Sequence, residues 1–92
     1  MKRVHIILSG DIQGIGFRYF ISSKAKSLGI NGWVKNLEYD KVEAIFEGND
    51  DNVKEILDSC VRGHSLAKIK NIKINKEDFK DEKEFKIRWK LL

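Results

Sequence analysis

A turn between a predicted strand and a predicted helix is formed by residues 10–20, which read GDIQGIGFRYF. Its glycines permit backbone conformations that other residues rarely adopt, so successive N–H groups can turn toward one point. The start of a helix adds roughly half a positive charge at the same place. Arg18 adds a permanent cation whose planar set of donors matches phosphate oxygens. The stretch therefore predicts a turn that is able to bind an anion.

The better-known phosphate-binding loops do not fit this stretch. A dinucleotide fingerprint needs a third glycine, but Gly14-x-Gly16 is followed by Phe17, Arg18 and Tyr19. A P-loop ends in Gly-Lys-Ser or Gly-Lys-Thr, and neither tripeptide is present. A glycine-rich turn can also serve only to reverse the chain. The stretch taken alone leaves both interpretations open.

The length and composition narrow the function classes. A chain of 92 residues is one small domain with one core, and we take residues 1–92 as that domain. The net charge of +4 favours anionic partners, while the 14 acidic residues argue against a nucleic-acid-coating tail. Cys60 is the single cysteine, which fits a reducing cytoplasm. With no signal peptide and no apolar run of about 20 residues, we expect a cytoplasmic monomer without membrane contact.

Hydrophobic periodicity predicts seven elements. A helix over 17–28 places apolar residues on one face, and a second helix begins at 49–51 and ends at Gly63. Strands are predicted at 4–9, 30–37, 42–47, 67–75 and 85–91. The order βαββαβ is that of the α+β, ferredoxin-like split βαβ sandwich. We expect a mostly antiparallel sheet, two helices on one face and an extra C-terminal edge strand.

Several local features follow from the same pattern. The apolar parity of 67–75 changes between Ile69 and Ile72, which predicts a bulge near Lys70-Asn71. Residues 38–41 form a hairpin turn in which Asp40 can take a left-handed conformation.

Asn36 lies at the end of the second predicted strand, and its amide can donate to and accept from a water molecule. An asparagine at a strand end is often only a turn residue. In the split βαβ plan, however, the first and third strands are neighbours and the second pairs with the third. The end of the second strand can then lie near the glycine-rich turn, which favours a functional role for Asn36.

Two stretches together resemble the acylphosphatase family. Residues 10–20 resemble its signature Gly-basic-Val-Gln-Gly-Val-x-Phe/Tyr-Arg-x-Phe/Tyr. Residues 32–48 resemble Gly-aromatic-Val-basic-Asn-x-x-x-Gly-x-Val followed by a distant glycine. The length, the element order and the position of both motifs agree, so the resemblance covers essentially the whole chain. Asp11 stands where the family usually has a basic residue, and Asp40 replaces the usual turn glycine.

The resemblance implies an enzyme that hydrolyses the carboxyl-phosphate bond of a small-molecule acyl phosphate. Arg18 would neutralise the phosphoryl charge, and Asn36 would orient the attacking water. Because positioning and charge stabilisation suffice for such a good leaving group, no metal or cofactor is expected. The resemblance places the phosphate on the backbone of the loop from Gln13 to Arg18, namely Gln13, Gly14, Ile15, Gly16, Phe17 and Arg18.

Two other functions remain open from the sequence. Related domains act as binding modules for carbamoyl or acyl phosphate inside larger proteins, without catalysis. RNA-recognition domains share the element order, but they carry exposed aromatic residues on the two central strands. Here residues 4–9 contain none, and Phe46 falls on the core-facing side, so we expect no nucleic-acid partner. His5, His64 and Cys60 are predicted to be structural residues.

Overall fold

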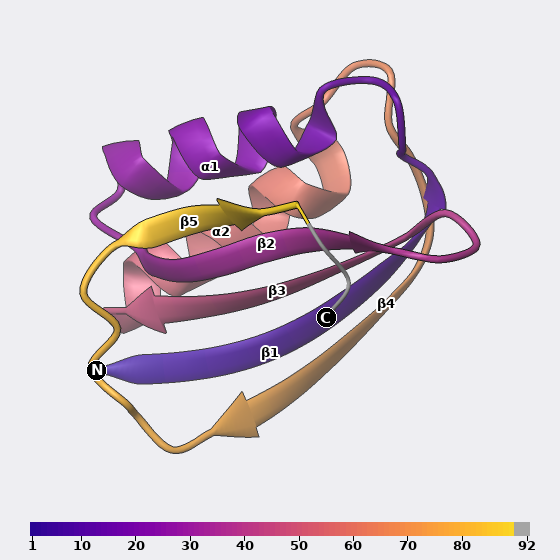
Figure 1. The fold of residues 1–92 in the computed structure, drawn as a ribbon. Coiled ribbons are helices and arrows are strands. Elements are labelled where there is room, and N and C mark those ends of the chain that lie inside the picture. The colour runs from indigo at the N-terminus through magenta and orange to yellow at the C-terminus, as the bar shows by residue number, and fades with distance from the viewer. Residues whose placement is uncertain (90–92) are drawn as a thin grey trace.

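The computed structural model describes residues 1–89, which form one five-stranded sheet with two helices packed on one of its faces (Figure 1). The spatial order of the strands is β4-β1-β3-β2-β5. This is the predicted ferredoxin-like sandwich with an added edge strand. Its elements are β1 (Lys2–Asp11), α1 (Phe17–Ser27), β2 (Asn31–Leu37), β3 (Lys41–Gly48), α2 (Asp50–Arg62), β4 (Lys68–Glu77) and β5 (Phe85–Arg88).

The sheet is antiparallel except at one edge. β1 lies between β3 and β4, β2 pairs with β3, and β5 alone runs parallel to its neighbour, β2. The predicted bulge is confirmed, because Ser9 pairs with Asn71 while Gly10 pairs with Ile69, which leaves Lys70 as the extra residue. The predicted hairpin turn is also present, with left-handed φ angles of 59° at Tyr39 and 56° at Asp40.

The last predicted strand is shorter than expected. β5 pairs with β2 only as far as the Arg88–Lys35 register, and Trp89 leaves the sheet to stack on Arg18. Residues 90 and 91, which were also assigned to this strand, lie outside the described part of the chain.

The core lies between the helices and the sheet. Burial alternates along β1 from Val4 to Gly10, so one set of its side chains faces the helices and the other faces away. β3 is buried on both faces from Ala44 to Gly48. The two central strands carry no Phe, Tyr or Trp on the face turned away from the helices, as predicted against an RNA-recognition domain. The buried residues on the helix side of these strands are Val4, Ile6, Leu8, Val42, Ala44 and Phe46, and the helices add Phe17, Ile21, Ala25, Val53, Ile56 and Cys60.

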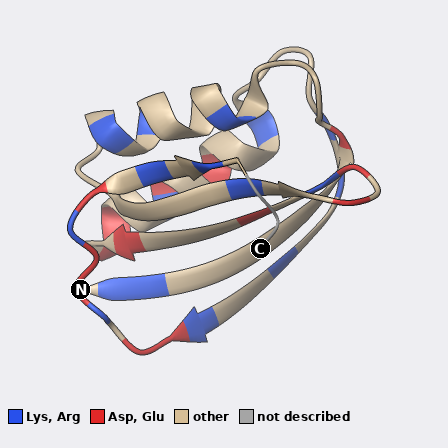
Figure 2. Cartoon of the chain, in the orientation of Figure 1, with Lys and Arg blue, Asp and Glu red and all other residues tan. Residues whose placement is uncertain are grey.

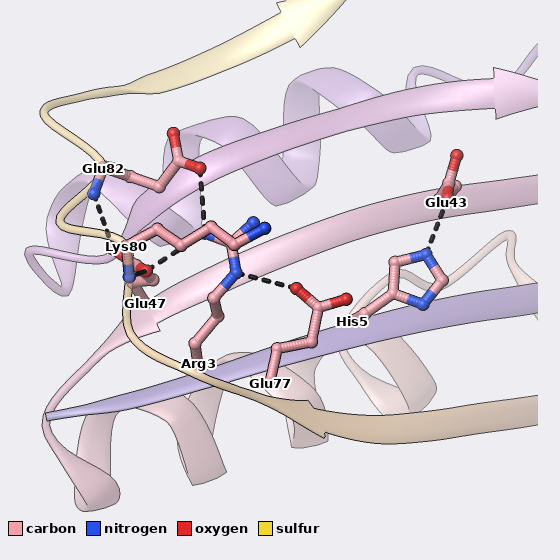
Figure 3. A network of polar contacts seen from close by, with 7 residues as sticks. All are labelled: Arg3, His5, Glu43, Glu47, Glu77, Lys80 and Glu82. Atoms are coloured by element: carbon pink, nitrogen blue, oxygen red, sulfur yellow. Dashed lines mark hydrogen bonds and ion pairs between the residues drawn. The ribbon is translucent and has the colours of Figure 1, made fainter.

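A buried ion-pair network lies at the N-terminal end of β1 (Figure 3). Arg3, only 6% exposed, contacts Glu47 at 3.0 Å and both Glu77 and Glu82 at 2.8 Å. The Glu47 carboxylate also accepts the backbone N–H groups of Lys80 and Glu82, at 2.7 and 2.6 Å. The network therefore fastens the segment that connects β4 to β5 onto the sheet.

The network shifts the pKa of its acids. Burial alone would raise the pKa of Glu47, but the two backbone N–H donors and Arg3 outweigh burial and lower it from the ordinary 4.5. The hydrogen bond from Arg3 likewise lowers the pKa of Glu77. Both carboxylates stay ionised at neutral pH, which is the state that a buried guanidinium requires.

We expect Glu47→Gln to lower the free energy of unfolding, measured by urea denaturation at pH 7, by about 2–3 kcal/mol. This is less than the roughly 3–5 kcal/mol for a buried charge left unpaired, because Arg3 retains Glu77 and Glu82. Glu55→Gln is the matched control, since the pair between Glu55 and Lys24 is exposed and contributes at most about 1 kcal/mol.

The same variant should change the acid sensitivity of the fold. A carboxylate with a lowered native pKa stabilises the fold above its unfolded-state pKa, and this stabilisation is lost as the pH falls through the native value. The unfolding free energy of the native sequence should therefore fall below pH 4.5, and the slope should be smaller in Glu47→Gln. Identical slopes would contradict the assignment of the shift to Glu47.

Candidate active site

The loop between β1 and α1 and the end of β2 enclose a cavity of about 130 Å³. Asn36 pairs with Val42 near the end of β2 and lies on the helix side, two residues beyond the buried Val34. Fold topology thus brings together residues that are 18 or more positions apart, since Asn36 faces the loop that ends at Arg18. The cavity is lined by Ile12, Gln13, Gly14, Gly16, Phe17, Arg18, Tyr19 and Asn36.

Most of the predicted phosphate-binding residues line this cavity. Ile15 is the exception, because its half-buried side chain packs against the core, and it does not line the cavity wall. Sequence reasoning missed Tyr19, which also lines the cavity and directly follows Arg18.

Two left-handed glycines shape the loop. Gly14 has φ 78° and Gly16 has φ 75°, a conformation that costs an L-residue about 1–2 kcal/mol. Gly16 occupies the N-cap of α1, so no side chain caps this helix, and its first turn contains no acidic residue. The uncharged loop from Ile12 to Phe17 leads into the helix, where Arg18 is the first charged residue (Figure 2).

The second helix provides an internal comparison. α2 is capped by Asn49, whose side chain accepts the N–H of Asn52 at 2.8 Å, and Asp50 and Asp51 occupy its first turn. One of its N-terminal donors is thus bonded to a side chain of the protein, and two acidic residues complement its dipole. α1 lacks both arrangements at the end that borders the cavity, so its N–H groups and positive end can act on an anion.

Gln13 ties the loop to the hairpin between β2 and β3. Its side-chain amide donates to the carbonyl oxygens of Leu37 at 2.5 Å and Lys41 at 3.1 Å. Its backbone N–H approaches Asp40 Oδ1 at 3.4 Å, and Gly10 N–H donates to the Asp40 carbonyl at 3.2 Å. The aspartate in place of the family's turn glycine therefore helps to fix the loop in position.

Arg18 is positioned by the C-terminal end of β5. Its Nη1 donates to the Arg88 carbonyl at 3.3 Å, and its guanidinium carbon lies 4.4 Å from the centre of a Trp89 ring. Such a cation–π contact orients a guanidinium without neutralising its charge. Sequence reasoning missed both partners, because the alternation of residues 85–91 indicated only an edge strand.

The residues predicted to be structural lie apart from the cavity lining. Asp11 is exposed beside Lys70, 3.8 Å away, so the departure from the family pattern places no negative charge on the cavity wall. His5 contacts Glu43 at 2.6 Å on the far face of the sheet, and His64 packs on the ring of Phe20 with the centroids 5.2 Å apart.

Cys60 belongs to the core and is 1% exposed. Burial raises the pKa of its thiol, which keeps it protonated and a poor nucleophile. Within residues 1–89 there is no cluster of three or more histidine, cysteine or acidic side chains that could hold a metal ion. Neither described helix is long and apolar enough to cross a bilayer.

The fold matches that of known proteins, and the chain belongs to the acylphosphatase family. The sequence model of that family, Acylphosphatase, matches residues 4–87. An acylphosphatase from Moorella thermoacetica is 43% identical over 88 residues, covering 96% of this chain and 95% of the relative. The crystal structure of acylphosphatase from Bacillus subtilis superposes with a TM-score of 0.90 at 29% identity, covering 96% of this chain and 99% of that one.

A larger protein contains a similar domain. The chain superposes on part of full-length HypF, crystallised in its phosphate- and nucleotide-bound form, with a TM-score of 0.86 and 26% identity. This match covers 95% of the present chain but 12% of HypF.

We expect the two glycines that flank the loop to differ in their tolerance of alanine. Gly14→Ala should cost about 1–2 kcal/mol of unfolding free energy, because only its left-handed φ is strained and no atom lies within 4 Å of the added Cβ. Gly10→Ala should cost about 3 kcal/mol or more, since its Cβ would lie 2.0 Å from the Lys68 carbonyl oxygen. Equal losses in urea denaturation would contradict this close approach.

Proposed function

We propose that this chain hydrolyses the carboxyl-phosphate bond of acyl phosphates, with the phosphoryl group bound by the loop from Gln13 to Arg18. The observation that carries the proposal is the shared cavity, in which an uncapped helix N-terminus, Arg18 and Asn36 all face one volume. The membership in the acylphosphatase family supports the same reaction. The helix N-terminus and the guanidinium supply positive potential to the phosphoryl oxygens.

In the proposed reaction Asn36 positions a water molecule opposite the acyl leaving group. The water oxygen bonds to phosphorus as the bond between phosphorus and the acyl oxygen breaks, and the electron pair leaves with the carboxylate. A proton of the water passes to a phosphoryl oxygen, so the products are the carboxylate and dihydrogen phosphate. Because the carboxylate is a good leaving group, the chain needs to supply only position and charge.

A binding module without catalysis is the weaker alternative. HypF supports it only through one similar domain that makes up a small share of that chain, whereas the Moorella thermoacetica relative and the Bacillus subtilis structure are matched along nearly their full length.

We also infer that the chain acts as a monomer in the cytoplasm and needs neither nucleic acid nor a cofactor. All residues of the proposed site come from one chain, and the buried thiol of Cys60 suits a reducing compartment.

Replacement of Arg18 tests the phosphoryl-binding role. Arg18→Ala should reduce kcat/KM for acetyl phosphate by at least about 100-fold and abolish competitive inhibition by inorganic phosphate. Arg62→Ala, which removes an exposed arginine paired with Asp58 on α2, is the matched control and should retain both properties. Normal phosphate inhibition in Arg18→Ala would refute the role.

Replacement of Asn36 tests the water-orienting role. Asn36→Ala should lower kcat about 100-fold while the inhibition constant for phosphate changes less than about threefold, because the amide acts on water rather than on phosphate. Asn75→Ala, at an exposed position of β4, should leave both constants unchanged. Losses of equal size in kcat and phosphate affinity would show that Asn36 is structural.

A further inference from the structure

The cavity beside Arg18 is small, with a volume of about 130 Å³. The proposed site places the phosphoryl group and the attacking water between the loop and Asn36, so a bulky acyl group extends beyond them toward the cavity mouth. Because Tyr19 belongs to the cavity lining, the side chains beside Arg18 are placed to contact such a group.

Two exposed aromatic side chains lie beside Arg18. Tyr19 lines the cavity and is 62% exposed, and Trp89 is 61% exposed. Their ring centroids are 5.7 Å apart with a tilt of 58°, a favourable aromatic geometry. The Trp89 ring also lies 4.4 Å from the Arg18 guanidinium carbon. Tyr19 thus forms part of the cavity wall, and Trp89 contacts both Tyr19 and the proposed phosphoryl-binding cation.

The exposure of this pair distinguishes it from the core aromatics. Phe17, Phe46 and Phe85 are at most 4% exposed and stabilise the interior. The rings of Tyr19 and Trp89 leave most of their surface open to solvent, where apolar area gains free energy by contact with another apolar group.

We propose that Tyr19 and Trp89 form an aromatic wall that binds the acyl group and makes this chain selective for acyl phosphates with aromatic or extended apolar acyl groups. The inference rests on the proposed function and adds a substrate class to it. Tyr19 is the diagnostic residue, because Trp89 also contacts Arg18 and its removal can affect every substrate. Acetyl and carbamoyl groups offer too little apolar surface to gain much from contact with the rings.

The test compares hydrolysis of benzoyl phosphate with that of acetyl phosphate. For each protein, kcat/KM for benzoyl phosphate is divided by kcat/KM for acetyl phosphate, and this quotient is compared between the native sequence and the variant. The intrinsic reactivities of the two substrates cancel in that comparison. Tyr19→Ala should lower the quotient by about 5- to 20-fold, the range expected for one aromatic contact with its apolar burial. Tyr19→Phe, which keeps the ring, should retain it.

Phe79→Ala is the matched control. Phe79 is 45% exposed and lies just beyond the end of β4 that is next to Arg3, at the opposite end of the sheet from the cavity. Its removal should leave the quotient unchanged. If Trp89→Ala lowers the rates of both substrates equally and Tyr19→Ala leaves the quotient unchanged, the wall serves only to position Arg18, and the inference is overturned while the proposed function stands.

A binding measurement separates failure of the inference from failure of the proposed function. In a Trp33→Phe background, Trp89 is the single tryptophan, so its fluorescence reports ligands at the wall. Phenylphosphonate should bind about 5- to 20-fold more tightly than methylphosphonate, and Tyr19→Ala should remove the preference. If neither acyl phosphate is hydrolysed, the proposed function fails, and a retained preference for phenylphosphonate still supports the wall. Equal affinity for the two phosphonates, or no binding of either, overturns the inference.

Discussion

A guanidinium buried in a small protein requires carboxylates around it, and Arg3 imposes this requirement on the whole architecture. Its partners Glu47 and Glu82 fix the connection between β4 and β5. β5 then runs parallel to β2 from the Arg3 end of the sheet to the cavity end. There Arg88, its last residue, and the following Trp89 contact Arg18. The ion-pair network at one end of the sheet and the β2–β5 pairing thus connect to a cation at the other end.

The ion-pair network and the proposed active site lie at opposite ends of the sheet. At the Arg3 end, every charged group of the network is paired within the protein, and α2 begins nearby with the N–H of Asn52 bonded to the Asn49 side chain. At the cavity end, α1 begins at a glycine without a side-chain cap. Free donors at a helix start lower the stability of the domain, but they remain available to an anion.

The sequence predicted the elements, the bulge and most of the cavity lining because these depend on local pattern and on one well-known topology. The sequence alone predicted that Asn36 lies near Arg18, because the split βαβ plan puts the end of the second strand near the glycine-rich turn. The Arg3 network was not predicted, because its four members come from β1, β3, β4 and the β4–β5 connection, and no periodicity marks them. Trp89 was misassigned for a related reason. The alternation of residues 85–91 fits a strand that includes Trp89. In the structure the β2–β5 pairing ends at Arg88, and Trp89 contacts Arg18 instead.

Cys60 is buried in the core and is the single cysteine of the chain, so the rate at which its thiol is alkylated reports how often the core opens. A thiol reagent cannot reach it in the closed state, so alkylation requires a fluctuation that detaches α2 from the sheet. When closing is fast relative to alkylation, the labelling rate measures the free energy of that fluctuation without denaturant. Binding of phosphate at the distant loop should slow the labelling, because a ligand that binds only the closed form lowers the population of open molecules.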